Sequence, residues 1–303
     1  MPDRVRITDV SPRDGLQNEP LVDGAPIPTE RKRQLIRSLV ACGADEVEVT
    51  SFVSPRWVPQ LADAATLCDM LAEDDHEGTV FSALVPNERG MEALCVANNR
   101  AKTPVISKAS VFTAASETFS KKNTNATIEE TIARFEPVTA MARDAGLALR
   151  GYVSCAIECP YEGKIEPAAV VDVAERLMSL GIDELDLGDT IGKASPETMA
   201  ALLTGLRDVI PVERAVVHLH DTFGGAAACV AVSLEHGIRA FDGSAGGLGG
   251  CPYASVRGER APGNIALRSL VEAVHACGFS TGVDLISLVE ADRLATSMIG
   301  GSQ

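Results

Sequence analysis

The chain has 303 residues, of which 46% are hydrophobic and 4% aromatic, so it can bury a large core built mainly from aliphatic side chains. Its formal net charge of −15 argues against nucleic acid as a partner, because such binding depends on clustered Lys and Arg. No apolar stretch reaches the roughly 20 residues that cross a bilayer, and no leader-like segment precedes Val5. We therefore expect a cytoplasmic protein without a membrane partner.

Short β-branched runs alternate with helix-like segments along the whole chain. The eight runs are Val5–Val10, Glu46–Phe52, Thr79–Val85, Val105–Phe112, Leu147–Cys155, Glu184–Thr190, Ala215–Thr222 and Ala240–Ala245. Apolar residues recur at helical spacing between them. The clearest helical segments are Glu30–Cys42, Ile128–Ala145, Ala168–Leu180, Pro196–Val209 and Gly225–His236. Thr29 is a candidate N-cap for the first helix, and Gly43, Gly146 and Gly181 are candidate stop signals.

Strict strand–helix alternation predicts a parallel sheet, and eight units predict a closed (β/α)₈ TIM barrel over a single domain, residues 1–303. An open doubly wound sheet is the competing α/β architecture, but no glycine-rich phosphate motif follows the first run. The Gly- and Pro-rich segment Leu248–Gly263 is predicted to be a long loop after the eighth strand. Loops at that end of a barrel carry the active site.

Two histidines, His218 and His220, stand at the end of the seventh run. Side chains two residues apart on a strand project to the same side, so the two imidazoles can supply adjacent ligands to one divalent metal ion. A hydrogen-bonded structural pair is the alternative. The eight cysteines, by contrast, are scattered through mostly apolar segments and are predicted to be reduced, mainly buried thiols.

Acidic and basic residues also follow other strands. Arg13 and Asp14 stand just past the first run, where Asp14 can complete a His/His/Asp metal site and Arg13 can stabilise an oxyanion. A surface ion pair in a turn is the alternative for these two residues. Glu48 and Asp189 point to the same rim, although acidic residues in such positions also cap helices. Two glycine pairs precede Cys251 and are typical of a mobile loop that could bring the Cys251 thiol to the active site. A structural loop with an incidental cysteine is the alternative.

Several motifs together resemble those of 3-hydroxy-3-methylglutaryl-CoA (HMG-CoA) lyases, from about residue 5 to about residue 290. They are Ser11–Glu19, Thr50–Gln60, Ala114–Glu117, Gly151–Cys155, Cys159–Gly163, Leu187–Gly192, and Gly247–Ala254 followed by Gly263 and Asn264. The resemblance implies a metal-dependent carbon–carbon lyase that splits HMG-CoA into acetoacetate and acetyl-CoA by a retro-Claisen reaction. It also implies an acyl-CoA substrate and a homodimer.

The resemblance further implies roles for individual residues. Mg²⁺ or Mn²⁺ is expected to be held by Asp14, His218, His220 and Asn264, of which Asn264 comes from the resemblance alone. Arg13 is expected to stabilise an enolate, Cys251 to take part in proton transfer, and Glu48 and Asp189 to support the site. His218 is also a candidate for moving the hydroxyl proton, if its metal bond leaves a nitrogen free.

The chain departs from the family pattern at several positions. Pro20 replaces a lysine, Glu158 a glycine and Gly225 a glutamine, Arg268 and Ser269 replace two acidic residues, and the connection over 254–263 is longer than usual. Arg257, Arg260 and Arg268 could contact an additional anionic group or the CoA phosphates, or could be solvated. The departures leave open a lyase for a longer 3-alkylglutaryl-CoA or citramalyl-CoA. A Claisen-type synthase and a non-enzymatic binding protein are the more distant alternatives.

Overall fold

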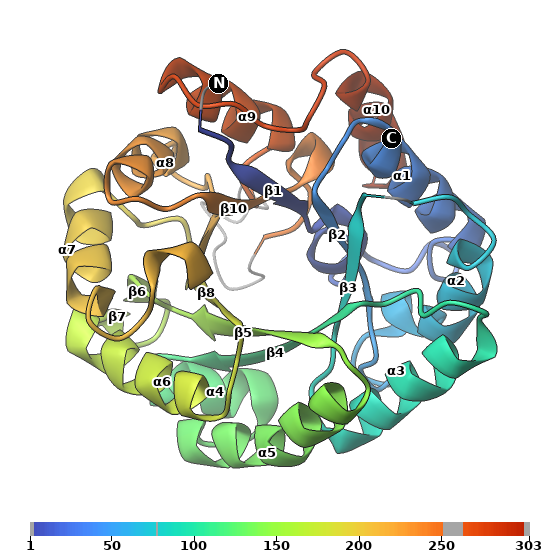
Figure 1. Ribbon diagram of the computed structural model, residues 1–303, viewed down its shortest axis with the longest axis horizontal. Coiled ribbons are helices and arrows are strands. Elements are labelled where there is room, and N and C mark those ends of the chain that lie inside the picture. The colour runs from blue at the N-terminus through green and yellow to red at the C-terminus, as the bar shows by residue number, and fades with distance from the viewer. Residues whose placement is uncertain (1–2, 77, 251–262, 300–303) are drawn as a thin grey trace.

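Eight parallel strands close into a barrel surrounded by helices (Figure 1). The computed structural model describes residues 3–76, 78–250 and 263–299. The strand order around the barrel is β1-β10-β9-β8-β5-β4-β3-β2. These strands are β1 (Arg6–Asp9), β2 (Glu46–Ser51), β3 (Val80–Leu84), β4 (Lys108–Ala114), β5 (Ala148–Ser154), β8 (Glu184–Asp189), β9 (Ala215–Leu219) and β10 (Ala240–Gly243). The predicted TIM-barrel class is confirmed, and the open sheet is wrong.

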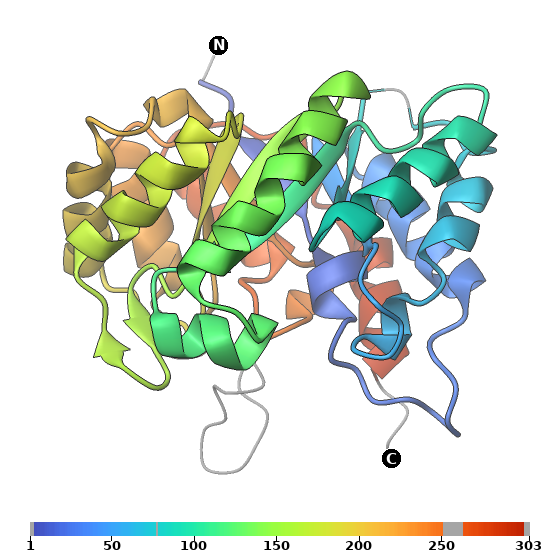
Figure 2. The ribbon, with the colours of Figure 1, turned by 90° about the horizontal axis from the view of Figure 1, so that it is seen from below.

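The helices cover the outside of the barrel (Figure 1). They are α1 (Thr29–Ala41), α2 (Ala64–Leu71), α3 (Glu88–Arg100), α4 (Glu117–Thr124), α5 (Ile128–Asp144), α6 (Pro167–Ser179), α7 (Pro196–Leu206), α8 (Ala226–Glu235), α9 (Leu267–Ala276) and α10 (Leu288–Ile299). A short hairpin of β6 (Glu158–Cys159) and β7 (Gly163–Lys164) follows β5, and it extends past the same end of the barrel as α4 (Figure 2). In the part of the chain described, no helix is both long and apolar enough to cross a bilayer.

The helix ends agree with the predicted stop signals but not with the predicted cap. Gly43, Gly146 and Gly181 have φ of +84°, +70° and +83° just beyond α1, α5 and α6. The N-cap prediction for Thr29 is wrong, because Pro28 occupies that position and Thr29 is the first helical residue. The Thr29 hydroxyl instead donates to Asp63 across 2.7 Å, which ties α1 to the segment before α2.

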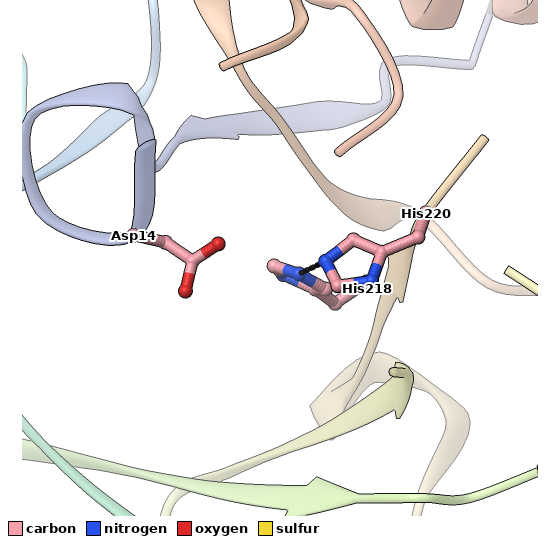
Figure 3. A group of neighbouring side chains, drawn as sticks. All are labelled: Asp14, His218 and His220. Atoms are coloured by element: carbon pink, nitrogen blue, oxygen red, sulfur yellow. Dashed lines mark hydrogen bonds between the residues drawn. The ribbon is translucent and has the colours of Figure 1, made fainter. Parts of the chain in front are cut away.

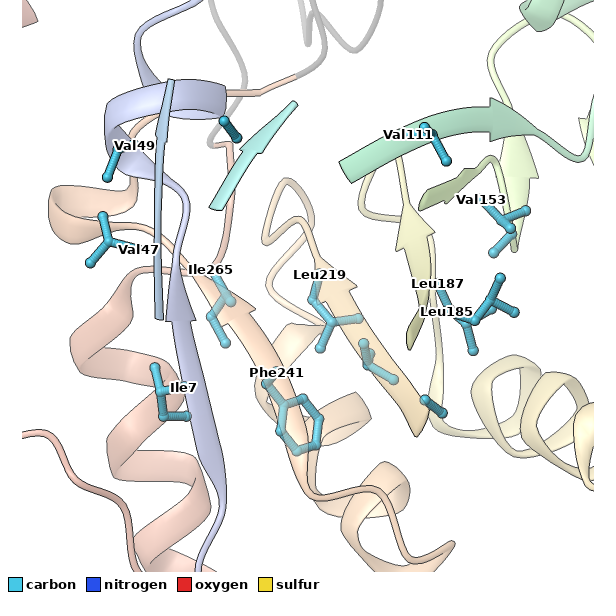
Figure 4. Packing of buried hydrophobic residues seen from close by; sticks show 14 of the residues in the cluster. Ile7, Val47, Val49, Val111, Val153, Leu185, Leu187, Leu219, Phe241 and Ile265 are labelled. Carbon is cyan, nitrogen blue, oxygen red and sulfur yellow. The ribbon is translucent and has the colours of Figure 1, made fainter. Parts of the chain in front are cut away.

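Apolar side chains pack between the strands and the helices, whereas the barrel interior is polar. Ile7, Val47 and Val49 belong to the buried hydrophobic cluster shown in Figure 4. Their neighbours Thr8 and Glu46 point the other way, since side chains alternate along a strand, and both contact an arginine inside the barrel. Branched aliphatic residues normally fill a TIM-barrel interior, so this polar filling is unusual.

Arg150 on β5 is the centre of the polar interior and is 0% exposed. Its guanidinium is 3.0 Å from Glu46, 3.2 Å from Glu184 and 3.4 Å from Asp242. Lys108 bridges Glu46 and Glu184 at 2.6 and 2.7 Å. Removing one partner from a buried ion pair leaves an uncompensated charge, which is strongly destabilising. The interior charges therefore hold one another in fixed positions below the carboxyl ends of the strands.

Glu184 gives this network a measurable pH dependence. Burial raises its pKa, but Arg150, Lys108 and Arg6 outweigh burial and lower the pKa from 4.5 to about 2. The stabilisation is present above pH 4.5 and is lost as the pH falls toward 2. We expect the difference in unfolding free energy between wild type and Glu184→Gln to shrink by about 2 kcal/mol from pH 5.5 to pH 3, measured by urea denaturation. A difference that stays constant over this range contradicts the prediction.

Candidate metal centre and active site

The carboxyl ends of β1 and β9 bring a carboxylate and two imidazoles together. Asp14 lies in a single π-helical turn, Ser11–Gly15, directly after β1. His218 is on β9 and His220 follows it. One ligand atom from each residue lies within 4.8 Å of the others, and Figure 3 shows the carboxylate pointing toward the two rings. Side-chain alternation along the strand thus predicts the shared side of the two histidines, and the barrel closure brings Asp14 opposite them.

Hydrogen bonds define which nitrogen of each imidazole carries the proton. His220 Nδ1 is 2.6 Å from the Thr190 carbonyl oxygen, which only accepts, so Nδ1–H donates and Nε2 keeps its lone pair. His218 Nδ1 is 3.2 Å from the Asp242 carboxylate, which likewise favours a proton on Nδ1. The two Nε2 atoms are 3.4 Å apart. Against the lowering effect of burial, the hydrogen bond and charge of Asp242 and the charge of Asp14 raise the pKa of His218. When both imidazoles are neutral, their Nε2 lone pairs point into the same space, which a cation would occupy favourably.

Asn264 completes the group from the other side. Its segment returns beside the end of β9, because Ile265 N donates to Leu219 O at 2.9 Å. The Asn264 amide nitrogen donates to Asp14 Oδ2 at 2.8 Å and to Leu248 O at 2.9 Å, which defines the amide orientation. Oδ1 is therefore left as a buried oxygen with no hydrogen-bond partner among the described residues. An orphaned oxygen beside a carboxylate is a suitable ligand for a hard divalent cation.

The electrostatics of the group also fit a cation. Burial raises the pKa of Asp14, but the positive charge of Arg13, reinforced by His218 and His220 when they are protonated, outweighs burial, so the pKa lies below 3.8 and the residue is a carboxylate. Burial, reinforced by His218 when that ring is protonated, lowers the pKa of His220 to about 4, so this imidazole is neutral at physiological pH. Neutral imidazole and ionised carboxylate are the forms that ligate metals. These residues could hold a divalent metal ion.

Arg13 is buried beside Asp14, and two carboxylates hold its guanidinium. Nε donates to Glu48 Oε2 at 2.5 Å, and Nη1 donates to Asp14 Oδ1 at 2.8 Å. The guanidinium carbon is 5.5 Å from the centre of the Tyr152 ring. Arg13 is thus anchored at the cavity wall by Glu48, which is fully buried and is not itself among the residues described as lining the cavity.

Asp189 ends β8 and shapes the loop behind His220. Its carboxylate accepts from the backbone nitrogens of Lys193 at 3.0 Å and Ala194 at 2.9 Å. Burial raises the pKa of Asp189 to about 6, against the lowering effect of these bonds. The loop that it closes presents the Thr190 carbonyl to His220. Asp189 is not among the described cavity-lining residues. It influences the metal group indirectly, because the loop that it holds carries the carbonyl that binds His220.

A cavity of about 730 Å³ opens above these residues. Arg13, Asp14, His218 and His220 line its base. Other lining residues come from the loops and from α4 and α5, including Trp57, Phe119, Lys122, Asn125 and Arg134. Cavities of this size accept small-molecule ligands. The candidate metal centre is therefore accessible to a substrate.

Cys251, Arg257 and Arg260 lie outside the described residues. The other positions that depart from the family pattern do not line the described part of the cavity. They are Pro20, Glu158, Gly225, Arg268 and Ser269. Arg268 donates to the Leu285 carbonyl at 3.1 Å and is 3.6 Å from Asp292 on α10. It therefore supports the packing of α10 and does not reach the cavity.

Gly249 leaves room for the metal ligands. A Cβ atom at this position would lie 2.5 Å from the Asn264 amide nitrogen and 3.1 Å from Asp14, and φ is +104°. The added methyl group would push Asn264 and Asp14 out of the metal group, so we expect Gly249→Ala to weaken Mn²⁺ binding by about tenfold or more, measured by electron paramagnetic resonance. The strain of a non-glycine residue at this φ, about 1–3 kcal/mol, is common to the variant and its control. Gly278→Ala is the matched control, because φ is +85° with nothing within 4 Å. Equal losses of Mn²⁺ affinity in both variants would contradict the prediction.

The fold and these side chains define a (β/α)₈-barrel enzyme with a candidate metal site at the carboxyl ends of its strands. The model of the HMGL-like family matches residues 4–295, and the chain belongs to this family. It is 44% identical to the mitochondrial hydroxymethylglutaryl-CoA lyase of Rattus norvegicus over 291 residues, which cover 96% of this chain and 84% of the relative.

Solved structures agree with this assignment. The HMG-CoA lyase from Brucella melitensis superposes with a TM-score of 0.89 at 44% identity, covering 98% of this chain and 99% of that one. An HMG-CoA lyase from Acinetobacter baumannii, in complex with coenzyme A and 3-methylmalate, gives a TM-score of 0.87 at 32% identity and covers 98% of this chain and 92% of that one. The resemblance identified from the sequence motifs is confirmed.

Proposed function

We propose that the protein is a metal-dependent carbon–carbon lyase that cleaves HMG-CoA into acetoacetate and acetyl-CoA. The observation that carries the proposal is the convergence of four donors at the base of the cavity. They are two imidazole lone pairs, one carboxylate and one orphaned amide oxygen. The relatives that are HMG-CoA lyases support the substrate, and the bound coenzyme A in one of them supports an acyl-CoA.

Different residues of this chain would perform the separate steps of a retro-Claisen cleavage. Asp14, His218, His220 and Asn264 would hold Mg²⁺ or Mn²⁺, which would lower the pKa of the substrate hydroxyl and orient its oxygens. A base removes the hydroxyl proton, the carbon–carbon bond breaks, and its electrons pass into a thioester enolate that is then protonated to acetyl-CoA. Arg13 offsets the charge of the enolate, because Glu48 holds its guanidinium beside the metal group.

The two roles proposed for His218 depend on one atom. Nδ1 is bound to Asp242, so Nε2 is the nitrogen that faces the cavity. Because Nε2 would also be the metal-ligating atom, His218 could accept the hydroxyl proton only at a nitrogen free of an ion. Asp189 acts in this proposal as a positioning residue for the loop that holds His220. The role of Cys251 in protonating the enolate rests on the family resemblance.

The cavity lining favours HMG-CoA as the substrate over a longer or differently branched thioester. The five departing residues outside the 254–263 connection are not among the described cavity-lining residues, so none of them is placed to contact an acyl group there. Lys122 and Arg134 line the cavity and are suited to contact the CoA phosphates. We also propose a single domain and a homodimer, and a cytoplasmic location like that of one of the rat relatives.

The test is acetyl-CoA release from a panel of 3-hydroxyacyl-CoA thioesters with Mg²⁺ or Mn²⁺, with chelated enzyme as the control. HMG-CoA is expected to have the highest kcat/KM, and chelation to abolish turnover. Faster release from citramalyl-CoA or from a longer 3-alkylglutaryl-CoA would overturn the substrate assignment. Consumption of acetyl-CoA with an oxo acid would indicate a Claisen-type synthase. A protein that binds no divalent cation and cleaves no thioester would refute the enzyme assignment.

A further inference from the structure

A buried carboxylate lies directly behind the candidate metal ligand His218. Asp242 is on β10, which pairs with β9 in a register that sets Asp242 beside His218. Asp242 is 2% exposed, and its Oδ2 is 3.2 Å from His218 Nδ1. Nδ1 is the nitrogen on the far side of the ring from His220, whose Nε2 lies 3.4 Å from His218 Nε2. The carboxylate therefore contacts the ligand without facing the cavity.

Asp242 is itself held from below. Its Oδ1 is 3.4 Å from Arg150 Nη1. The other end of the Arg150 guanidinium bonds Glu46 at 3.0 Å and Thr8 at 3.3 Å. Arg150 is completely buried, and moving it away would deprive the buried Asp242 of its guanidinium partner. A continuous line of bonds thus runs from the centre of the barrel through Asp242 to the imidazole of His218.

The same region could be considered for a second cation. Asp186, His218 and Asp242 each offer a ligand atom within 4.8 Å of the others. However, Arg150 Nη1 is 3.4 Å from Asp242 and 3.7 Å from Asp186. The fixed positive charge of the guanidinium therefore already lies against both side chains, where the cation would have to bind. Placing a divalent ion beside a guanidinium in a low-dielectric interior would be strongly repulsive. The cluster is better suited to orienting His218.

We propose that Asp242, fixed by Arg150, is a positioning residue that keeps the proton of His218 on Nδ1 and directs the Nε2 lone pair into the metal group. This inference rests on the proposed metal site. A ring nitrogen that donates to a carboxylate makes the opposite nitrogen more basic and limits rotation of the ring. Replacement by an amide removes the negative charge. A rotated amide would also present its NH₂ to Nδ1, which favours the tautomer with the proton on Nε2, where it blocks metal binding.

The test compares Asp242→Asn with Glu184→Gln, which removes one negative charge from the same network. Glu184 is 3.2 Å from Arg150 and contacts it on the side away from His218. Mn²⁺ binding by electron paramagnetic resonance is expected to weaken about 10- to 100-fold in Asp242→Asn, and to remain as in wild type in Glu184→Gln. The Mn²⁺ concentration for half-maximal activity should rise in parallel, with kcat largely recovered at saturating Mn²⁺.

Wild-type Mn²⁺ affinity in Asp242→Asn, or an equal loss in Glu184→Gln, would overturn the positioning role. If wild type itself binds no Mn²⁺, the proposed metal site fails, and this outcome is distinct from the first. Should Asp242→Asn not fold, long-range ¹H–¹⁵N spectra of wild type labelled at histidine, with saturating Mg²⁺, provide a second measurement. His218 is expected to carry its proton on Nδ1, and a proton on Nε2 would refute the inference.

Discussion

Replacing Asp14 with Asn is expected to lower the rate of acetyl-CoA release by about a thousandfold, because several kcal/mol of charge stabilisation depend on a bound dication. Asp14 supplies the carboxylate of the candidate metal group, and no other described acidic residue lies with both His218 and His220 in that group. An asparagine cannot reproduce the pairing, because its NH₂ would face the amide nitrogen of Asn264 or the donors from Arg13. The measurement is kcat at fixed Mn²⁺ together with Mn²⁺ affinity.

The fold should survive this substitution, since the side chain stands in the turn after β1 and outside the hydrophobic cluster. Asp69→Asn is a suitable control. It also removes one carboxylate, and Asp69 forms an exposed ion pair with Arg100 at 3.3 Å. The control should have wild-type activity. If Asp14→Asn turned over HMG-CoA within a few-fold of wild type, Asp14 could not be a ligand that the reaction requires.

The strand and helix pattern could be predicted from the sequence because the two periodicities differ clearly. The stripe of Leu35, Ile36 and Leu39 has helical spacing, and all three residues are buried in α1. Alternation also predicted that His218 and His220 share one side. The N-cap at Thr29 was wrong because a cap depends on local backbone geometry, which Pro28 determines here.

The polar centre of the barrel could not be predicted in the same way. Arg150 and Asp242 are 92 residues apart in the chain, and only the barrel register brings them to 3.4 Å. Single charged residues in predicted strands indicate a polar face, but they do not say which other strands that face meets. A usable signal was present in the alternation of Arg150 and Tyr152 within an otherwise apolar run, which indicates that one side of β5 is polar.

Asn264 was accessible only through the family resemblance. It belongs to an isolated bridge with His220, between two segments that have no shared periodicity. The Gly263 carbonyl accepts from Asp221 N at 2.9 Å, which brings the segment alongside the end of β9. Such a contact depends on the path of a loop, and loop paths are set by tertiary hydrogen bonds that local composition does not encode.

Arg13→Gln is expected to lower kcat by about 100- to 1,000-fold, since one well-placed donor to a developing oxyanion contributes about 3 kcal/mol. The reason lies in how Arg13 is held. Glu48 accepts from Nε at 2.5 Å and Asp14 accepts from Nη1 at 2.8 Å, so the guanidinium is preorganised beside the metal group before substrate arrives. Glutamine is neutral and can satisfy only one of these carboxylates at a time.

Arg13→Lys separates charge from geometry. Lysine keeps the positive charge but lacks the planar fork that reaches Glu48 and Asp14 together, so its kcat should fall between those of wild type and Arg13→Gln. Mn²⁺ affinity should change much less than in Asp14→Asn, because Arg13 is not a ligand. A kcat within threefold of wild type in Arg13→Gln, at saturating substrate and Mn²⁺, would show that the enolate is stabilised without this guanidinium.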